Sequence, residues 1–245
     1  MAREDVLARL AELGFSEDDA GVLADHFLDA ERRGKPSHGL VRVEWLASQS
    51  RDPRASARRV VAEPAFERWD GNGAFGYLTL AAICDAQLAS PPARVRIVVA
   101  SDAFPLGMLG YWVRQLASGG LVALLTSTSP RRLGSPEGGP PLAGTNPLAI
   151  GIPSSDGRPL VADVSMGRVT HGDVLLGRAT DADLVPFGGE QAHKAFALAV
   201  GLQAFVEALA GGDSPGAVLL VAQPSADPVP ALRALAAGVR LPGDS

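Results

Sequence analysis

The stretch Lys35-Pro36-Ser37-His38-Gly39-Leu40-Val41-Arg42 directly follows two segments whose apolar residues recur at helical spacing. Gly34 and the proline after it end the second of these helices. If the chain then becomes helical again, His38 and Arg42 stand four residues apart and point the same way. A guanidinium group can hold a substrate carboxylate through two parallel hydrogen bonds. The stretch therefore predicts a carboxylate-binding site here, and an incidental surface arginine at a helix start is the structural alternative.

A second motif, Gly144-Thr145-Asn146-Pro147, precedes an apolar run and is typical of a tight turn entering a strand. Together, the two motifs resemble the malate/L-lactate dehydrogenase family that lacks a Rossmann fold, which also holds Δ1-piperideine-2-carboxylate and ureidoglycolate enzymes. The resemblance implies an α/β fold, with a helical N-terminal part (residues 1–65) and a mixed-sheet α/β domain of that family's type (residues 66–245). It also implies NADH or NADPH as cofactor and a homodimer whose active site lies near the subunit boundary.

The same resemblance assigns roles to single residues of this chain. It places His38 and Arg42 beside substrate and cofactor. It also assigns cofactor contacts to Ser127 and Thr128 after one expected strand, to Asp163 and Ser165 after another, and to Lys194 in the stretch His193-Lys194-Ala195-Phe196. A loop rich in serine and threonine can also be a plain connection, and that alternative stays open for residues 127 and 128.

One position departs from the family pattern in a way that bears on chemistry. The stretch Ser101-Asp102-Ala103-Phe104-Pro105 resembles a family segment whose histidine exchanges a proton with the substrate, and Pro105 stands in that position. Proline has no side-chain proton to give. We expect Asp102, His38 or His171 to replace the missing acid. Two further departures are a short link between Ser165 and Gly188 and a family segment that continues past the end of this sequence.

The composition of the chain excludes several classes of protein. With 245 residues, 47% of them hydrophobic, the chain can bury a full core. A net charge of −5 argues against nucleic acid as a partner. The charged start and the lack of an evident membrane span predict a cytoplasmic protein without membrane contact. Cys84 is the only cysteine, so we expect no internal disulfide and no metal site, and its apolar neighbours predict a buried helical position.

The pattern of apolar residues predicts an α/β succession of elements. We expect helices within residues 4–33, with Ser16 as an N-cap, and over 76–89, 110–118 and 191–210; we expect strands over 95–99, 121–125, 148–152, 160–164 and 217–222. Residues 51–70 are rich in arginine, and we expect them to form an irregular connection. The sequence Gly71-Asn72-Gly73-Ala74-Phe75-Gly76 fits G-x-G-x-x-G, but without a strand leading into it we do not interpret it as a dinucleotide loop.

Three hypotheses for function follow from these observations. The first is an NAD(P)H-dependent oxidoreductase acting on a small 2-oxo, 2-hydroxy or cyclic 2-imino acid in a biosynthetic pathway. The second is a redox-inactive relative that needs no cofactor and uses the same carboxylate-binding cleft for a cyclisation, elimination or isomerisation in specialised metabolism. The third is a non-catalytic binding protein that keeps only the fold. Binding of NADH or NADPH separates the first from the other two.

Overall fold

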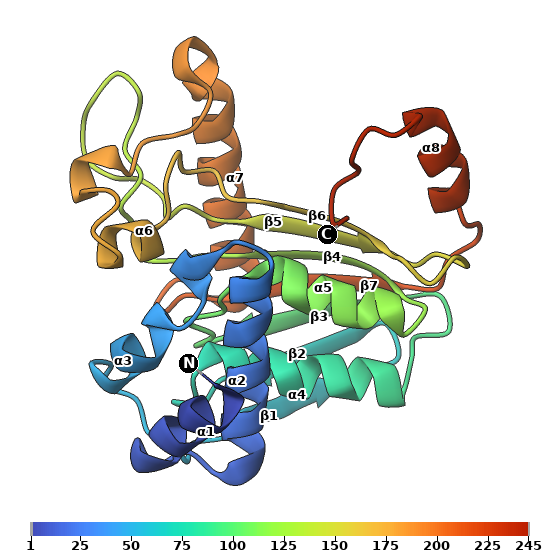
Figure 1. Cartoon of the computed structure of the whole chain (residues 1–245), viewed down its shortest axis with the longest axis horizontal. Helices are drawn as coiled ribbons and strands as arrows, with labels where there is room; N and C mark the ends of the chain where they lie inside the picture. Colours follow the sequence, from blue (N-terminus) through green and yellow to red (C-terminus); the bar gives the residue numbers. More distant parts are fainter. Residues whose placement is uncertain (1, 245) are drawn as a thin grey trace.

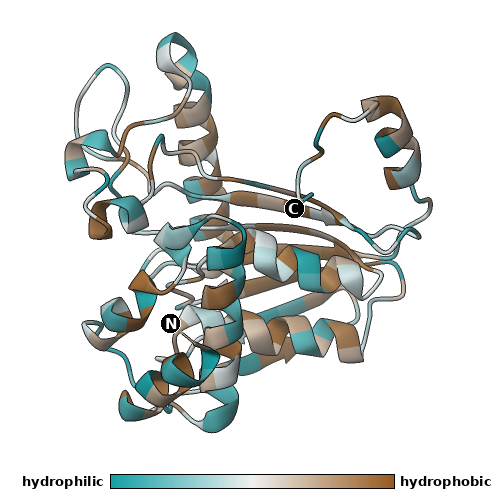
Figure 2. Ribbon diagram, viewed as in Figure 1, coloured by the Kyte–Doolittle hydropathy of each residue, from teal (hydrophilic) through white to brown (hydrophobic). Residues whose placement is uncertain are grey.

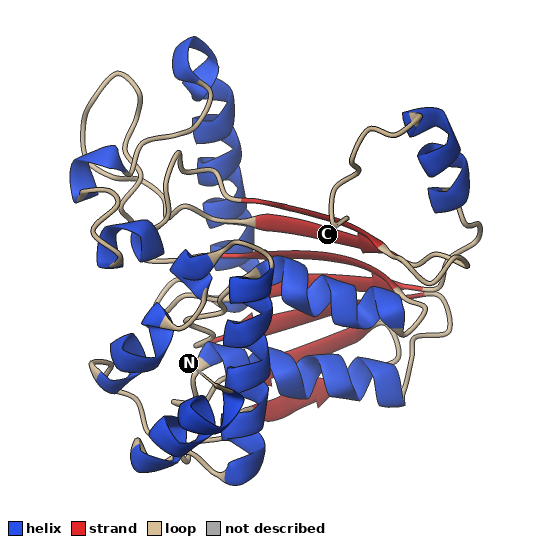
Figure 3. Cartoon of the chain, viewed as in Figure 1, coloured by secondary structure: helices blue, strands red, loops and turns tan. Residues whose placement is uncertain are grey.

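The computed structural model describes residues 2–244, which form a seven-stranded sheet with helices on both faces (Figures 1 and 3). The strands are β1 (Arg58–Ala62), β2 (Phe66–Asp70), β3 (Val95–Ser101), β4 (Val122–Ser127), β5 (Leu148–Ile152), β6 (Leu160–Val164) and β7 (Ala217–Ala222). The α-helices are α1 (Arg3–Glu12), α2 (Glu17–Arg32), α3 (Val41–Ala47), α4 (Gly76–Ala89), α5 (Leu109–Ser118), α6 (His171–Leu175), α7 (Ala192–Ala210) and α8 (Val229–Ala236). Short 3₁₀ turns occupy Pro36–His38, Asp181–Asp183 and Gly189–Gln191.

The sheet is mixed, with the strand order β1-β2-β3-β7-β4-β5-β6. Only the pair β2–β3 is parallel, and α4 makes the crossover between these two strands. The other neighbours, including β7 inserted between β3 and β4, are antiparallel. The mixed-sheet α/β class expected from the sequence is therefore confirmed.

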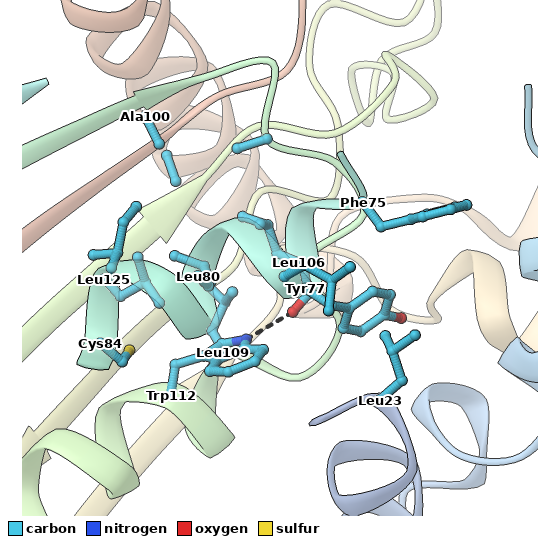
Figure 4. Packing of buried hydrophobic residues seen from close by; sticks show 14 of the residues in the cluster. Leu23, Phe75, Tyr77, Leu80, Cys84, Ala100, Leu106, Leu109, Trp112 and Leu125 are labelled. Atoms are coloured by element: carbon cyan, nitrogen blue, oxygen red, sulfur yellow. Dashed lines mark hydrogen bonds between the residues drawn. The ribbon is translucent and has the colours of Figure 1, made fainter. Parts of the chain in front are cut away.

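One face of the sheet carries the main hydrophobic core, beneath α4 and α5 and, further out, α2 (Figure 1). Trp112 of α5 is fully buried there, and its indole N–H donates a hydrogen bond of 2.9 Å to the carbonyl of Leu106 (Figure 4). Cys84 of α4 lies in the same core, as predicted, and burial raises the pKa of its thiol. This core supports the segment between β3 and α5, which borders the cleft described below.

The opposite face of the sheet is covered only in part, by α7 over β3, β7 and β4. Beside α7, large apolar side chains remain exposed on the sheet, including Ile97 and Leu124, and α7 itself exposes Leu198 and Phe205. Figure 2 shows that hydrophobic residues run along the central strands of the sheet. By length and composition alone, Gly189–Ala210 is also apolar enough to cross a membrane, with 28% of that window buried. One such helix is weak evidence for a membrane segment, since core helices of soluble proteins pass the same test.

Most elements lie where the apolar pattern predicts them. The helices over residues 4–33, 76–89, 110–118 and 191–210 are confirmed to within a residue or two, and the Ser16 hydroxyl caps α2 by accepting from the Asp19 amide. The strands over 148–152, 160–164 and 217–222 are confirmed as well.

Residues 51–70 were expected to be an irregular connection, and that expectation is wrong. They contain β1 and β2, which pair with each other, and β2 also pairs with β3. Glu67 is one of the charged residues that interrupt the apolar pattern of this segment. It is buried, and it accepts hydrogen bonds from the Trp69 indole on its own strand and from the Gln87 amide on α4. Because β1 belongs to the sheet, it joins the expected N-terminal part to the expected α/β part; the division at residue 65 stays a prediction.

The glycine-rich sequence 71–76 also needs a correction, because β2 leads directly into it and α4 follows. The N-terminus of α4 is nevertheless closed to a phosphate. The amide of Gly76 donates to the carbonyl of Phe104, and a side chain at Gly76 would collide with the backbone of Phe104 and Pro105. This loop packs against protein rather than cradling a ligand.

Candidate active site

A single large cleft, with a volume of about 1240 Å³, opens between the α2–α3 connection, the segment before α5 and the loops that follow β4 and β6. Its volume exceeds the roughly 300–1000 Å³ of an ordinary small-molecule pocket, so it has room for two ligands side by side. The motif 35–42 forms one wall, and residues 104–110 form the floor beside it.

The cleft is basic although the chain as a whole is acidic. Nine basic side chains line it, against three acidic ones. The basic residues are Arg32, Arg33, Lys35, Arg42, Arg114, Arg132, Arg168, Arg178 and Arg240, and the acidic ones are Asp163, Asp173 and Asp244. Some of the arginines are paired; Arg114, for example, donates to Asp29 at 2.8 Å. The excess of positive charge favours anionic ligands.

Arg42 lies in the first turn of α3, with its side chain buried in the cleft wall. Its Nε donates to the carbonyl of Ser37 at 2.9 Å, and its guanidinium lies 5.0 Å from the ring centroid of Trp45. Within residues 2–244 this Nε contact is the only hydrogen bond recorded for the side chain, so both terminal nitrogens are available to a ligand. Burial lowers the pKa of the guanidinium, a cost that a bound carboxylate would offset.

His38 lies beside Arg42 in the 3₁₀ turn that precedes α3. Burial, together with the charge of Arg42, lowers the pKa of His38 to about 3, so the imidazole is neutral at pH 7. Its Nδ1 is buried without a hydrogen-bond partner. His171, at the start of α6, also lines the cleft, and burial followed by the charges of Arg132 and Arg42 lowers its pKa. Neither histidine is a charged acid at neutral pH.

Asp102, the third candidate for the missing acid, does not lie in the cleft. Its carboxylate accepts from Arg51 at 2.6 Å and from the amide of Gly73 at 2.8 Å, and the residue is not among those of the described chain that line the cleft. The expectation that Asp102 supplies the proton is therefore corrected: its two oxygens join the glycine-rich loop to Arg51. Pro105 itself is buried in the cleft floor.

Asp163 and Ser165 line the cleft at the end of β6. The Asp163 carboxylate accepts from the amide of Gly110 at 2.7 Å and so caps the first turn of α5. Desolvation raises the pKa of Asp163, while this hydrogen bond and the charge of Lys35 act in the opposite direction. The Ser165 hydroxyl donates to the carbonyl of Thr145 at 3.3 Å and so joins the loop after β6 to the turn before β5.

Ser127 and Thr128 lie at the cleft end of β4, as expected, and both line the cleft. The Thr128 hydroxyl accepts from the amide of Gly216 at 2.9 Å and ties β4 to the loop before β7. Lys194 does not join this group. It lies exposed on α7 and is not among the cleft-lining side chains of residues 2–244. The other lysine, Lys35, does line the cleft.

The turn Gly144–Pro147 is held in place by hydrogen bonds to α7. Asn146 is fully buried, and its side-chain amide donates to the carbonyl of Ala199 and to the Gln203 side chain of α7 at 2.9 and 2.8 Å. Gln203 also accepts from the amide of Gly144. The motif therefore anchors the loop after β4 to α7, in agreement with a turn that enters the sheet.

The sequence analysis did not single out several residues of the cleft. Tyr77 is the most notable: its side chain is fully buried, it forms part of the cleft floor, and its hydroxyl has no hydrogen-bond partner. A tyrosine among apolar residues at the start of a helix gives no signal that distinguishes it from a core residue. Arg114 and Arg132 could not be told apart from the other arginines of the chain. Lys35, by contrast, begins the motif 35–42 and is one of only two lysines in the chain.

Comparison with known proteins agrees with this arrangement. The family model for malate/L-lactate dehydrogenase matches residues 2–183. The chain belongs to the malate/L-lactate dehydrogenase family. It is 33% identical over 172 residues to the (2R)-3-sulfolactate dehydrogenase (NADP⁺) of Chromohalobacter salexigens, covering 68% of this chain and 51% of that protein. It is 31% identical over 229 residues to the Δ1-pyrroline-2-carboxylate/Δ1-piperideine-2-carboxylate reductase of Pseudomonas putida, covering 81% and 66%.

Solved structures extend the likeness over almost the whole chain. A dehydrogenase from Sinorhizobium meliloti superposes with a TM-score of 0.82 at 28% identity, over 99% of this chain and 88% of that one. The Δ1-piperideine-2-carboxylate reductase of Pseudomonas syringae pv. tomato gives 0.82 at 26% identity, over 99% and 89%. By sequence, the chain spans about half the length of the first curated relatives it matches. These relatives are dehydrogenases and reductases of small carboxylic acids, and the sulfolactate dehydrogenase is NADP⁺-dependent.

The residues of the cleft fit a nicotinamide dinucleotide. Its phosphates need cations or free backbone amides, and the first turns of α4 and α5 donate to Phe104 and Asp163 instead. The basic side chains of the cleft, Lys35 among them, would supply the positive charge in place of a helix N-terminus. Ser127 offers a hydroxyl at the same wall.

Proposed function

We propose that this protein is a reductase that uses NADH or NADPH to reduce a small 2-oxo acid or cyclic 2-imino acid. The observation that carries the proposal is Arg42, a buried guanidinium in a basic cleft whose terminal nitrogens have no protein acceptor among the described residues. A carboxylate can accept two parallel hydrogen bonds from these nitrogens. The remaining volume takes the cofactor, with Lys35, Ser127 and Asp163 on the surrounding walls.

The bound cofactor would supply the hydride, and the chain's own residues would hold the substrate and keep its surroundings dry. Pro105, Leu106 and Met108 give the floor an apolar surface, which strengthens the electrostatic hold of Arg42 on a carboxylate. Neutral His38 beside Arg42 can donate or accept a hydrogen bond without adding charge.

Binding of cofactor and turnover test this proposal together. NADH and NADPH are titrated into the pure protein by calorimetry, and we expect a Kd on the order of micromolar for one of them. Loss of the cofactor's near-ultraviolet absorbance is then followed with pyruvate, oxaloacetate, 3-sulfopyruvate and Δ1-pyrroline-2-carboxylate. Failure of both dinucleotides to bind at millimolar concentration would reject the reductase and leave the cofactor-free enzyme or the binding protein.

We also propose that the protein is a homodimer. The exposed apolar residues of the partly covered sheet face and of α7, namely Val95, Ile97, Leu124, Leu198, Phe205 and Leu209, form the surface that a second copy would cover. A stable dimer usually buries more than about 2000 Å² of mostly apolar surface, and isolated exposed side chains would not need covering. Light scattering at micromolar concentration should give twice the chain mass, and a monomer there would contradict the proposal.

A further inference from the structure

The three side chains expected to replace the missing acid do not offer an acidic proton in the cleft at neutral pH. Pro105 has none, and Asp102 is held by Arg51 outside the cleft. His38 and His171 have lowered pKa values, so neither carries the extra proton at neutral pH. Tyr77 is different: burial raises the pKa of its phenol to about 12, so it keeps its proton throughout the physiological range.

The position of the Tyr77 ring is fixed on several sides. It packs edge-on against His26 and Phe27 of α2, with ring centroids 5.0 and 5.3 Å apart. A side chain at Gly107 would collide with Cε1 of Tyr77, the carbon next to the one that bears the hydroxyl. The hydroxyl end of the ring therefore lies beside Gly107, two residues beyond Pro105 in the cleft floor.

The floor itself is held in place against that ring. The amide of Met108 donates to Nε2 of His26 at 3.1 Å, and the Trp112 indole donates to the carbonyl of Leu106 at 2.9 Å (Figure 4). Tyr77 is drawn in the same view, next to Leu106. The segment that carries Pro105 therefore cannot move away from Tyr77 without breaking both hydrogen bonds.

The Tyr77 hydroxyl is buried and has no hydrogen-bond partner among the described residues. Nδ1 of His38, which lines the same cleft, and Nδ1 of His26, whose ring packs against that of Tyr77, share that property. The charge of Arg42 also acts on Tyr77 and favours its phenolate. Buried polar groups without partners are rare, and several together under a cleft indicate a site that a ligand completes.

We propose that Tyr77 is the proton donor of the reaction, taking the part that an imidazole at position 105 would otherwise play. This assignment rests on the proposed reductase function. C2 of the substrate receives a hydride from the reduced nicotinamide, and the electron pair of its C=O or C=N bond moves to oxygen or nitrogen. That atom takes the proton of the Tyr77 hydroxyl, forming a new O–H or N–H bond. The substrate is reduced, the nicotinamide is oxidised, and the phenolate, stabilised by Arg42, regains a proton from water.

Two variants separate this role from a structural one. Tyr77→Phe removes only the hydroxyl and keeps the buried ring. Tyr111→Phe makes the same change at the other tyrosine of the chain, which does not line the cleft. With whichever substrate of the panel the parent protein reduces, we expect Tyr77→Phe to lower kcat roughly 10²–10⁴-fold. KM should change little, because Arg42 still holds the carboxylate, and Tyr111→Phe should leave kcat and KM near the parent values.

A second readout does not depend on turnover. Tyrosine labelled with ¹³C at Cζ gives two signals, assigned with the two variants, and oxamate is added as a carboxylate that carries an amide carbonyl in place of the ketone. We expect oxamate, with NADPH or NADH present, to shift the signal of Tyr77 and not that of Tyr111. If the parent reduces none of the panel, the proposed function fails on that panel, and the oxamate experiment still decides the role of Tyr77. Unchanged kcat in Tyr77→Phe, or no shift of the Tyr77 signal by bound oxamate, would overturn the assignment.

Discussion

Replacement of Arg42 gives the sharpest test of the carboxylate clamp. In the parent protein two terminal nitrogens would each donate to the carboxylate, and a hydrogen bond to a charged group contributes about 1.5–3 kcal/mol. Arg42→Lys keeps the charge but not the planar fork, so we expect oxamate to bind roughly 10- to 150-fold more weakly, the equivalent of one lost contact. Arg42→Ala loses both contacts, and we expect at least about a 100-fold loss.

Stability must be measured alongside binding, because Arg42 is buried and its loss disturbs the packing around it. Its loss leaves the Ser37 carbonyl without a partner and removes the contact with Trp45, which together cost about 1–3 kcal/mol in the free energy of unfolding. Urea unfolding gives this cost, and calorimetry with NADPH present gives the affinity for oxamate.

The control for charge alone is Arg178→Ala, which removes an exposed cleft arginine whose side chain makes no hydrogen bond to the described residues. We expect only a small loss of affinity there, sensitive to salt. If folded Arg42→Ala binds oxamate as tightly as the parent, Arg42 is not the clamp. If Arg178→Ala matches its loss, the cleft attracts anions by its general field and the fork of Arg42 is irrelevant.

Three further predictions concern groups around the site. The pKa of His38 falls to about 3 on folding. The free energy of unfolding should therefore drop as pH decreases from about 6.5 toward 3, by up to about 1.4 kcal/mol per pH unit. His38→Gln should flatten this slope in urea unfolding measured at several pH values. Asp102→Asn should lower the free energy of unfolding by about 1 kcal/mol because it weakens the contact with Arg51. Cofactor affinity measured by calorimetry should not change, and a large loss of affinity would show that Asp102 belongs to the site. Cys84 should resist a thiol reagent in the folded protein and react only as fast as the chain unfolds, so rapid labelling would show that α4 opens locally.

The sequence predicted best those parts of the fold whose burial follows a simple period. The helix over residues 76–89 and the strands over 148–152 and 217–222 have continuous apolar patterns and lie where expected. Strand β2 was missed because Glu67 and Arg68 interrupt its pattern. Glu67 is buried only because Trp69, Gln87 and Arg96 surround it, and no local pattern records partners up to 29 residues away.

The candidate site shows the same limit. The motif 35–42 pointed to Arg42, and the structure places that side chain in the cleft wall. Asp102 stood next to the expected catalytic segment in sequence, yet its carboxylate turns to Arg51, 51 residues away. Tyr77 lies far from both motifs along the chain, and only the packing of α4 under the segment 104–110 brings its ring to the cleft. Asp102 was expected to be the acid because it is close to the expected catalytic segment in sequence. Tertiary packing instead places Tyr77 at the cleft.

The cluster formed by His26, His38 and Tyr77 carries a cost that folding alone does not explain. Each buried polar atom without a partner costs about 1–3 kcal/mol, and a phenylalanine at position 77 would fill the same space without that penalty. Four further buried polar atoms without a partner, on Thr79, Arg114, Gln115 and Arg233, lie outside this cluster. The cluster differs from these atoms because His38 lies beside Arg42, whose terminal nitrogens have no protein acceptor among the described residues. A ligand with one carboxylate and one polar atom at C2 would satisfy both at once, which is the chemistry of a 2-oxo or 2-imino acid.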